Sequence, residues 1–276
     1  MNRLWMICLL LVSTSVCAQQ LPKIKGSGII TLKEVEIEEP FEVIDIDGDF
    51  DIELNQGNTD MYTIETDDNL IDVIQFRVED NTLKISATHR IVKKKKFKIT
   101  VTASTISEIH LNNEARVKGD GLLQGENLVV TAGKSSKFDL DVAYSGAIDI
   151  ELFSNADGTI KTKSGSSKVT LDGRATLKMY AIADSLESTV SDTSRLTLDG
   201  TIETAKLTLS GSGKLLAKEA LLTATDITLS DSSDAYIQVK ETITLYAQDS
   251  AELQLYGEPS ITVTGLKNKA KILKKE

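Results

Sequence analysis

The feature that most constrains the fold is a repeat that begins near residue 104. Short clusters rich in Ser, Gly and Asp each precede a short strand in which apolar and polar residues alternate, as in "SDTSRLTLDG" and "SGSGKLLAKE". The residue after each cluster recurs at steps of 21, 10, 27, 19, 21 and 16, at Lys137, Gly158, Lys168, Arg195, Lys214, Ala235 and Ala251. A coil of short strands that restarts about every twenty residues is typical of a β-solenoid, whose backbone hydrogen bonds run between successive coils.

The small residues of these clusters allow two interpretations. Stacked corners leave room only for small residues that accept unusual backbone angles. Alternatively, the cluster hydroxyls form a polar ladder that contacts a polymer, from Ser136, Ser167, Ser194, Ser212 and Ser233. The corner interpretation is preferred, and the two can hold together.

The chain before residue 104 also alternates, over residues 29–35, 41–54, 62–66, 74–78, 82–87 and 97–101. Gly, Asn and Asp separate these runs and favour turns. Only three prolines occur, so few strands are barred from the interior of a sheet. The sequence predicts an all-β chain in which an N-terminal β section over residues 19–103 is continuous with a Ser/Gly-punctuated β-solenoid section over residues 104–276.

Five carboxylates fall on every second residue of "IDIDGDFDIEL", residues 44–54. An EF-hand calcium loop needs glycine at its sixth position and a bidentate Glu at its twelfth. Counted from Asp45 the twelfth residue is Gln56, and counted from Asp47 it is Asn58, so the loop pattern fails. The alternation predicts the solvated face of a strand instead, with weak surface binding of a divalent cation as the alternative.

The first eighteen residues have the pattern of a secretory signal peptide. A basic start at Arg3 precedes an apolar core over residues 4–12, which is too short to span a membrane. Cleavage is expected after Ala18. Lipidation of Cys17 is the alternative, although Val16 is larger than the residue that a lipoprotein signal places before its cysteine. The sequence therefore predicts an exported protein that is periplasmic, associated with the outer membrane or at the cell surface.

Cleavage would also change the chemistry of the chain. Both cysteines and the single tryptophan lie before Gln19, so the exported chain would have no disulfide and no thiolate. The loss of Arg3 moves the formal net charge from -10 to -11. So acidic a chain repels nucleic acid and anionic lipid at long range. No later apolar run approaches the ~20 residues that a transmembrane segment needs.

The order of several segments resembles one known family. These segments are "GSGIITLKEVEIEEPFEVIDIDGDFDIELNQG", "NLIDVIQFRVEDNTLKIS", the Ser/Gly-punctuated strands and "LYGEPSITVTGLKNKAKILKK". Over roughly residues 26 to 273 they are similar to the putative auto-transporter adhesin head GIN domain family of Bacteroidetes. One departure is "LNNEARV" at 111–117, where the family more often carries a Ser/Gly turn. The resemblance implies a right-handed parallel β-helix-like fold and an envelope location, and it implies little about function, because the adhesin label of the family is an inference from architecture.

The residues offer little for catalysis or metal binding. His89 and His110 lie in different strands, and neither has a second histidine at ligand spacing. Glu108 shares a strand face with His110, but no nucleophile motif such as GxSxG accompanies them. The sequence predicts no enzyme, no catalytic residue, no metal and no cofactor.

The chain has one dense positive segment and few aromatic residues. Lys93, Lys94, Lys95 and Lys96 follow one another, and they either guard an exposed edge or contact an anionic envelope glycan or a lipopolysaccharide phosphate. Aromatic residues make up 5% of the chain, which supplies a sugar-stacking platform poorly. Tyrosines recur at steps of 10 and either line one side of adjacent coils or fill them, at Tyr236, Tyr246 and Tyr256.

Together these patterns predict an exported, non-enzymatic envelope or cell-surface protein, an adhesin or macromolecule-binding β-solenoid. The expected ligand-binding residues are Lys93 to Lys96, and the expected partner is an envelope glycan or another surface macromolecule. Two alternatives stay open: a carbohydrate-binding or carbohydrate-cleaving β-helix, and a passive scaffold of the envelope. The sequence sets neither the ligand nor the oligomeric state.

Overall fold

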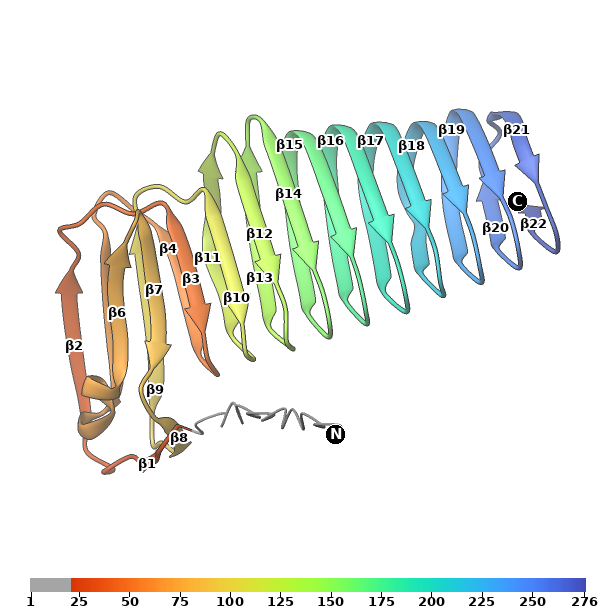
Figure 1. The fold of residues 1–276 in the computed structure, drawn as a ribbon. Helices are drawn as coiled ribbons and strands as arrows, with labels where there is room; N and C mark the ends of the chain where they lie inside the picture. Colours follow the sequence, from red (N-terminus) through yellow and green to blue (C-terminus); the bar gives the residue numbers. More distant parts are fainter. Residues whose placement is uncertain (1–20) are drawn as a thin grey trace, which may run out of the picture.

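The computed structural model describes residues 21–276, so the predicted signal peptide and its cysteines lie outside the described residues. Strands make up 69% of the structure and helix 2%. The chain forms a β-solenoid of about nine turns, with a strand-rich cap at its N-terminal end (Figure 1). The predicted all-β solenoid, continuous with its N-terminal section, is confirmed.

Two β-sheets face each other across the core. The first sheet begins with β2 (Ile30–Glu36), β5 (Met61–Asp67), β9 (Phe97–Ala103), β4 (Asp51–Gln56), β11 (Arg116–Gly125) and β13 (Lys137–Tyr144). The second sheet begins with β6 (Ile74–Glu79), β7 (Thr82–Ala87), β3 (Val43–Asp47), β10 (Glu108–Asn112), β12 (Leu128–Ala132) and β14 (Ala147–Leu152).

Longer strands then cross from the first sheet to the second within each coil. They are β15 (Asp157–Leu171), β16 (Thr176–Val190), β17 (Arg195–Leu209), β18 (Lys214–Leu229) and β19 (Asp234–Ala247). β20 (Glu252–Tyr256) in the first sheet and β21 (Ser260–Leu266) in the second make the last complete coil, and β22 (Lys271–Lys274) adds one further strand to the first sheet. A separate parallel pair, β1 (Lys23–Lys25) and β8 (Arg90–Lys93), lies beside the cap, and a 3-10 helix, η1 (Asp68–Val73), links β5 to β6.

Parallel pairing in register explains the core. Each residue lies beside its equivalent in the next coil, so the alternation of one strand becomes a buried column through many coils. In β18, Ile227 and Leu229 are 2% and 1% exposed, whereas Thr228 between them is exposed. Leu229 pairs with Leu209 in the preceding coil and Ala247 in the next.

Apart from the cluster "SGSS" at 164–167, the Ser/Gly clusters form the tight corner at the lower end of each coil (Figure 1). Residues with positive φ recur there about every twenty residues, among them Ser154, Gly173, Asp192, Gly211 and Asp231. Such backbone angles favour Gly, Asn and Asp. A backbone N–H of each such turn also donates a hydrogen bond to the turn before it. The Ser212 amide nitrogen, for example, lies 2.6 Å from the Asp192 carbonyl oxygen.

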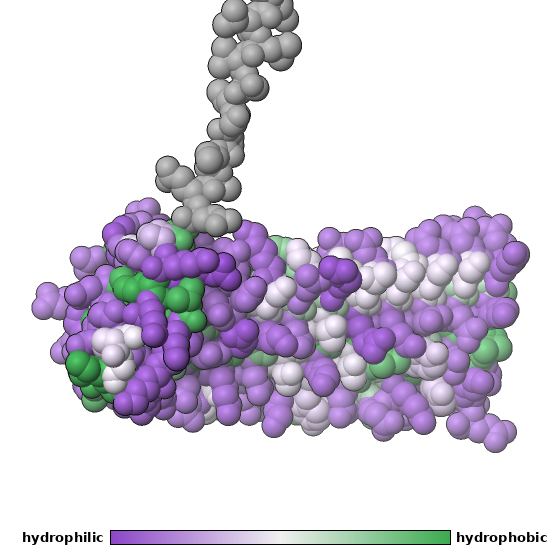
Figure 2. Space-filling model, turned by 90° about the horizontal axis from the view of Figure 1, so that it is seen from below, coloured by the Kyte–Doolittle hydropathy of each residue, from purple (hydrophilic) through white to green (hydrophobic). Residues whose placement is uncertain are grey.

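The cluster serines have different positions. Ser136, Ser194 and Ser233 are fully buried, and their hydroxyls donate to carbonyl oxygens of their own turns. Ser212 is exposed at a turn tip, and Ser167 lies in the second-sheet half of β15. Four of the five serines, Ser167 included, are buried, so their hydroxyls do not form one exposed ladder. The corner interpretation explains Ser136, Ser194 and Ser233. Seen from below, this corner carries pale rows within a mostly hydrophilic surface (Figure 2).

The irregular step of 10 in the repeat also has a structural reason. Gly158 and Lys168 belong to the same strand, β15, but pair within different sheets. The cluster "SGSS" before Lys168 is thus the opposite corner of the coil, where the strand crosses without a break.

The N-terminal section begins the solenoid and also closes it. β3 and β4 pair in parallel with β10 and β11 and make the first coil. The antiparallel strands β2, β5 and β6 lie beyond it, where Tyr62 and Phe76 stack with ring centroids 3.7 Å apart. Leu70 of η1 is fully buried behind them. The division at residue 103 stays a prediction, and all strands of this antiparallel cap precede it.

The acidic run at 44–54 differs from the predicted single strand. It forms β3 and β4, joined by a corner at Gly48, whose φ is 144°. The inward alternation is confirmed, since Ile44, Phe50 and Ile52 are at most 3% exposed. Outward, Asp49 accepts a hydrogen bond of 2.8 Å from Arg116. Inward and outward side chains go on alternating through this corner, so the alternation in the sequence does not reveal the bend.

Candidate functional site

The predicted lysine segment links β8 to β9 at the lower edge of the cap. All four side chains, Lys93 to Lys96, are exposed. The backbone is held by Asp67, which is 1% exposed and accepts the Lys95 N–H at 2.8 Å and the Gly28 N–H at 2.6 Å. These donors, Lys95 first, hold the pKa of the Asp67 carboxyl below its ordinary value of 3.8. The segment is therefore a fixed loop rather than a free hairpin tip.

The four ammonium groups are not equivalent. Lys96 forms an ion pair of 2.6 Å with Glu65, and Lys95 donates to the Gly28 carbonyl at 3.2 Å. Lys94 lies over the ring of Phe97, with 4.1 Å between Nζ and the ring centroid. Lys93 has no ion pair within the part of the chain that the structure describes. Lys93 and Lys94 are thus the members best placed to meet an anionic ligand.

Pairing of β1 with β8 adds cations that the sequence alone did not bring together. Lys23 pairs with Arg90, and Lys25 pairs with Lys93. We call Lys23, Lys25, Arg90, Lys93 and Lys94 the basic platform. The segments "KIK" and "RIVK" each begin and end with a basic residue, but nothing in either segment specifies that the two strands pair.

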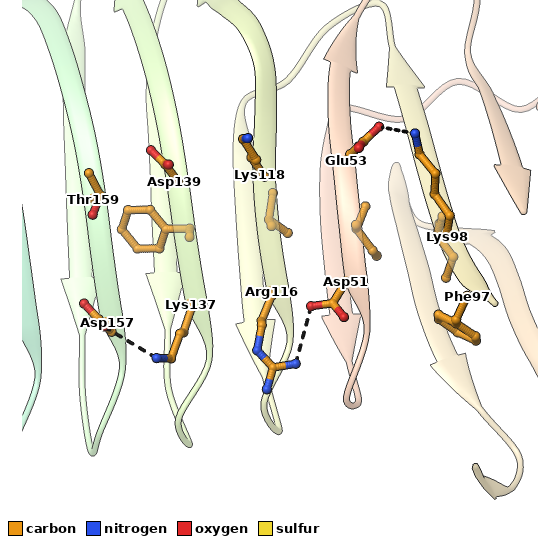
Figure 3. Close-up of a pocket in the computed structure, with 14 residues that line it drawn as sticks. Asp51, Glu53, Phe97, Lys98, Arg116, Lys118, Lys137, Asp139, Asp157 and Thr159 are labelled. Atoms are coloured by element: carbon orange, nitrogen blue, oxygen red, sulfur yellow. Dashed lines mark hydrogen bonds and ion pairs between the residues drawn. The ribbon is translucent and has the colours of Figure 1, made fainter. Parts of the chain in front are cut away.

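A groove of about 620 Å³ begins at Phe97 and crosses the outer face of the first sheet over β9, β4, β11, β13 and β15 (Figure 3). Its charged side chains are four cations and four anions: Lys98, Arg116, Lys118, Lys137, Asp51, Glu53, Asp139 and Asp157. Three pairs bridge neighbouring strands, Lys98–Glu53 at 2.9 Å, Arg116–Asp51 at 3.4 Å and Lys137–Asp157 at 3.7 Å. The hydrogen bond that Lys98 donates to Glu53 raises the pKa of Lys98, and the one that Arg116 donates to Asp49 raises the pKa of Arg116.

One row of the groove is left without such pairs. Lys118 pairs in register with Asp139, and Asp139 with Thr159, so an ammonium, a carboxylate and a hydroxyl follow one another across three strands (Figure 3). Among residues 21–276 these three side chains make no hydrogen bond or ion pair with protein groups. They can donate to and accept from a ligand rich in hydroxyl groups.

Sequence reasoning missed the groove residues. Alternation indicates that Glu53, Lys118 and Asp139 face outward, but only the strand register places them side by side. Glu53 and Lys118 are partners across β4 and β11, and no local motif marks that pairing.

The other candidates are not brought together. Tyr236 and Tyr256 lie in the first sheet and Tyr246 in the second, so the three tyrosines do not line one side. His110 contacts Glu108 of its own strand, with 3.0 Å between Nε2 and Oε2. Within residues 21–276 there is no group of three or more His, Cys, Asp or Glu placed to hold a metal ion. The same residues include no helix that is both long and apolar enough to cross a membrane.

Comparison with protein families identifies the chain. The profile of the family described as "Putative auto-transporter adhesin, head GIN domain" matches residues 40–183 and again 148–259. The chain belongs to this family. The two matches overlap within this GIN-domain protein, as expected for a solenoid in which one coil resembles the next.

Solved structures similar to the GIN-domain protein support its fold. A putative adhesin from Parabacteroides merdae has a TM-score of 0.72 and 16% identity, and one from Parabacteroides distasonis has 0.73 and 15%. A putative lipid binding protein from Parabacteroides distasonis has 0.66 and 17%. Each comparison covers 92% of this chain and 100% of the other. No protein with a curated function matches the GIN-domain sequence.

Proposed function

We propose that this GIN-domain protein is an exported, non-enzymatic binding module that holds an acidic glycan of the cell envelope or of another cell surface. The observation that carries the proposal is the contact between Lys94 and Phe97, because it joins the basic platform to the groove. The platform would attract carboxylate or phosphate groups, and the groove would bind the sugar hydroxyls. Membership of an adhesin-like family supports a surface role.

The two parts would contribute differently to binding. The groove carries equal numbers of cations and anions, so it adds orientation and hydrogen bonds rather than net attraction. The basic platform lies on a chain whose formal net charge is -10, so it is the region that attracts an anionic polymer. A neutral glycan would use the groove alone and bind more weakly.

The arrangement of carboxylates favours binding over cleavage of the glycan. Glycoside hydrolysis usually requires two carboxyl groups, one as acid and one as base or nucleophile. Three of the four groove carboxylates are held in ion pairs, those of Asp51, Glu53 and Asp157. Asp139 is the fourth, and it alone cannot fill both roles.

Retention on immobilised polysaccharides tests the proposal. We expect the chain to bind polygalacturonate more tightly than dextran at low salt, and to lose that preference at 1 M salt, where the Debye length falls to ~3 Å. Replacing Lys93 to Lys96 with Gln should weaken binding to polygalacturonate by roughly tenfold or more, a change of ~1.4 kcal/mol. Lys118→Gln combined with Asp139→Asn should weaken binding to both polymers.

The matched control removes four exposed lysines elsewhere, at Lys163, Lys178, Lys218 and Lys240. This control lowers the net charge by as much as the variant of Lys93 to Lys96 does, and it should leave retention nearly unchanged. Equal losses in the two lysine variants would mean that only net charge matters. Retention of the wild type on neither polymer would refute the proposed ligand class.

A further inference from the structure

The last described coil leaves one end of the core open. β21 pairs only with β19, and β22 only with β20, so among the described residues their outer edges have no partner. Ile261, Val263 and Leu266 continue the inward columns of Ile243, Leu245 and Ala247. The three residues of β19 are each 1% exposed, but those of β21 are 45%, 51% and 50% exposed. A solenoid end of this kind normally needs a capping surface.

The two edge strands at this end differ in how well they are protected against pairing with another strand. β22 carries Lys271 and Lys274, and Lys274 forms an ion pair of 2.7 Å with Glu258. Charges of this kind block edge-to-edge pairing. β21 has the sequence SITVTGL and carries no charge. Its free edge and exposed apolar column are therefore suited to receive another strand.

The opposite end of the molecule is complementary in charge. Residues 257–276 contain five lysines and two glutamates, whereas residues 30–42 contain five glutamates and one lysine. The acidic segment includes β2, the outermost strand of the first sheet, and β22 is the other edge of that same sheet. Two lysine-rich ends would repel each other, so charge favours contact between opposite ends.

Strand direction and side-chain chemistry agree with that contact. β2 is antiparallel to β5, and β5 to β9, so β2 runs in the same direction as every solenoid strand of the first sheet, β22 included. A copy stacked on the end would thus continue the parallel ladder through β22 and β2. In the second sheet, β21 would meet β6 as an antiparallel neighbour, since β6 is antiparallel to β7 and β7 is parallel to the solenoid strands. Phe76 and Val78 of β6 are half-buried apolar residues.

We propose that copies of this chain associate head to tail, with the β21–β22 end of one copy docked on the β2–β6 end of the next. The contact pairs the exposed column of Ile261, Val263 and Leu266 with the apolar edge of the cap, and the lysines of the C-terminal end with the glutamates of β2. Because the two surfaces differ, the contact is heterologous and leaves a free end on each new copy. Assembly therefore continues beyond a dimer.

Sedimentation velocity of the mature chain tests this inference over concentrations from about 1 to about 300 µM, since such assembly follows mass action. The expected result is a sedimentation coefficient that rises with concentration past the value for a dimer and falls back in 1 M salt. Val263→Asp should weaken association by roughly tenfold or more by placing a charge in the contact. Thr244→Asp, an exposed position one coil inward, is the matched control and should change nothing.

Charge-reversal variants test whether the lysine-rich C-terminal end contacts the glutamate-rich β2 end. Replacing Lys267, Lys269 and Lys271 with Glu should abolish association, and so should replacing Glu34, Glu36 and Glu38 with Lys. An equimolar mixture of these two variants should assemble again, because each acidic end then meets a basic one. Circular dichroism would show that each variant is folded. A wild type that stays monomeric, that stops at a dimer or that is insensitive to salt would overturn the proposal.

Discussion

Truncation of Leu229 to Ala tests whether the columns of the solenoid core carry its stability. Leu229 is 1% exposed and lies between Leu209 and Ala247 in adjacent coils. The change removes three carbon atoms, which at ~0.8 kcal/mol per buried CH₂ gives about 2.4 kcal/mol. The cavity left behind adds to this, because parallel strands fixed by hydrogen bonds on both sides collapse poorly, so we expect about 3 kcal/mol.

Denaturant unfolding followed by circular dichroism measures this loss, with Thr228→Ala as the control in the same strand. Thr228 is exposed, so its truncation should change the free energy of unfolding by less than ~0.5 kcal/mol. If unfolding is two-state, Leu229→Ala should lower the melting temperature by roughly 6–12 °C, at 2–4 °C per kcal/mol for a chain of this size. Similar losses in the two variants would refute the inward assignment of Leu229.

Three further predictions concern the N-terminal half. The mature protein should begin at Gln19 and carry no free thiol, which mass spectrometry of the exported protein checks, and a lipidated cysteine at its start would contradict this. Millimolar calcium should leave the melting temperature unchanged, because only a ligand of the native state raises it; a rise of several degrees that is lost when Asp47 and Asp49 become Asn would restore the metal interpretation. The pKa of Asp67 is lowered on folding, so its contribution to stability is present above about pH 4 and is lost as the pH falls through the lowered pKa. Hydrogen exchange of residues 93–96, corrected for its intrinsic pH dependence, should therefore accelerate in acid, and Asp67→Asn should make it fast already at neutral pH.

The sequence was most informative where structure depends on neighbours along the chain. The alternation around Thr228 is enough to assign Ile227 and Leu229 to the core, where the structure buries them, because side-chain direction in a strand has a period of two. The Ser/Gly clusters marked the corners for a similar reason, since a turn needs particular backbone angles at particular residues. The acidic run at 44–54 kept its alternation even though the chain bends within it.

The sequence was least informative where structure depends on which strands become neighbours. The step of 10 between Gly158 and Lys168 arose because clusters at the two corners of a coil have the same composition. The antiparallel cap and the pairing of β1 with β8 join segments that are far apart in the chain, and no local pattern specifies their register. The groove depends on the same long-range register, so its residues could be assigned to a face but not to a site.

Several coils of the solenoid separate the groove from the C-terminal end. The groove extends from β9 to β15, and the coils of β16 to β19 lie between it and the C-terminal end. Each coil advances the solenoid by about 4.8 Å, the spacing of neighbouring strands. Gain or loss of one such coil would lengthen or shorten this spacer by that amount while leaving the groove and the β21–β22 edge intact. The number of coils would therefore set the distance between the groove and the β21–β22 edge in steps of one coil, without changing either surface.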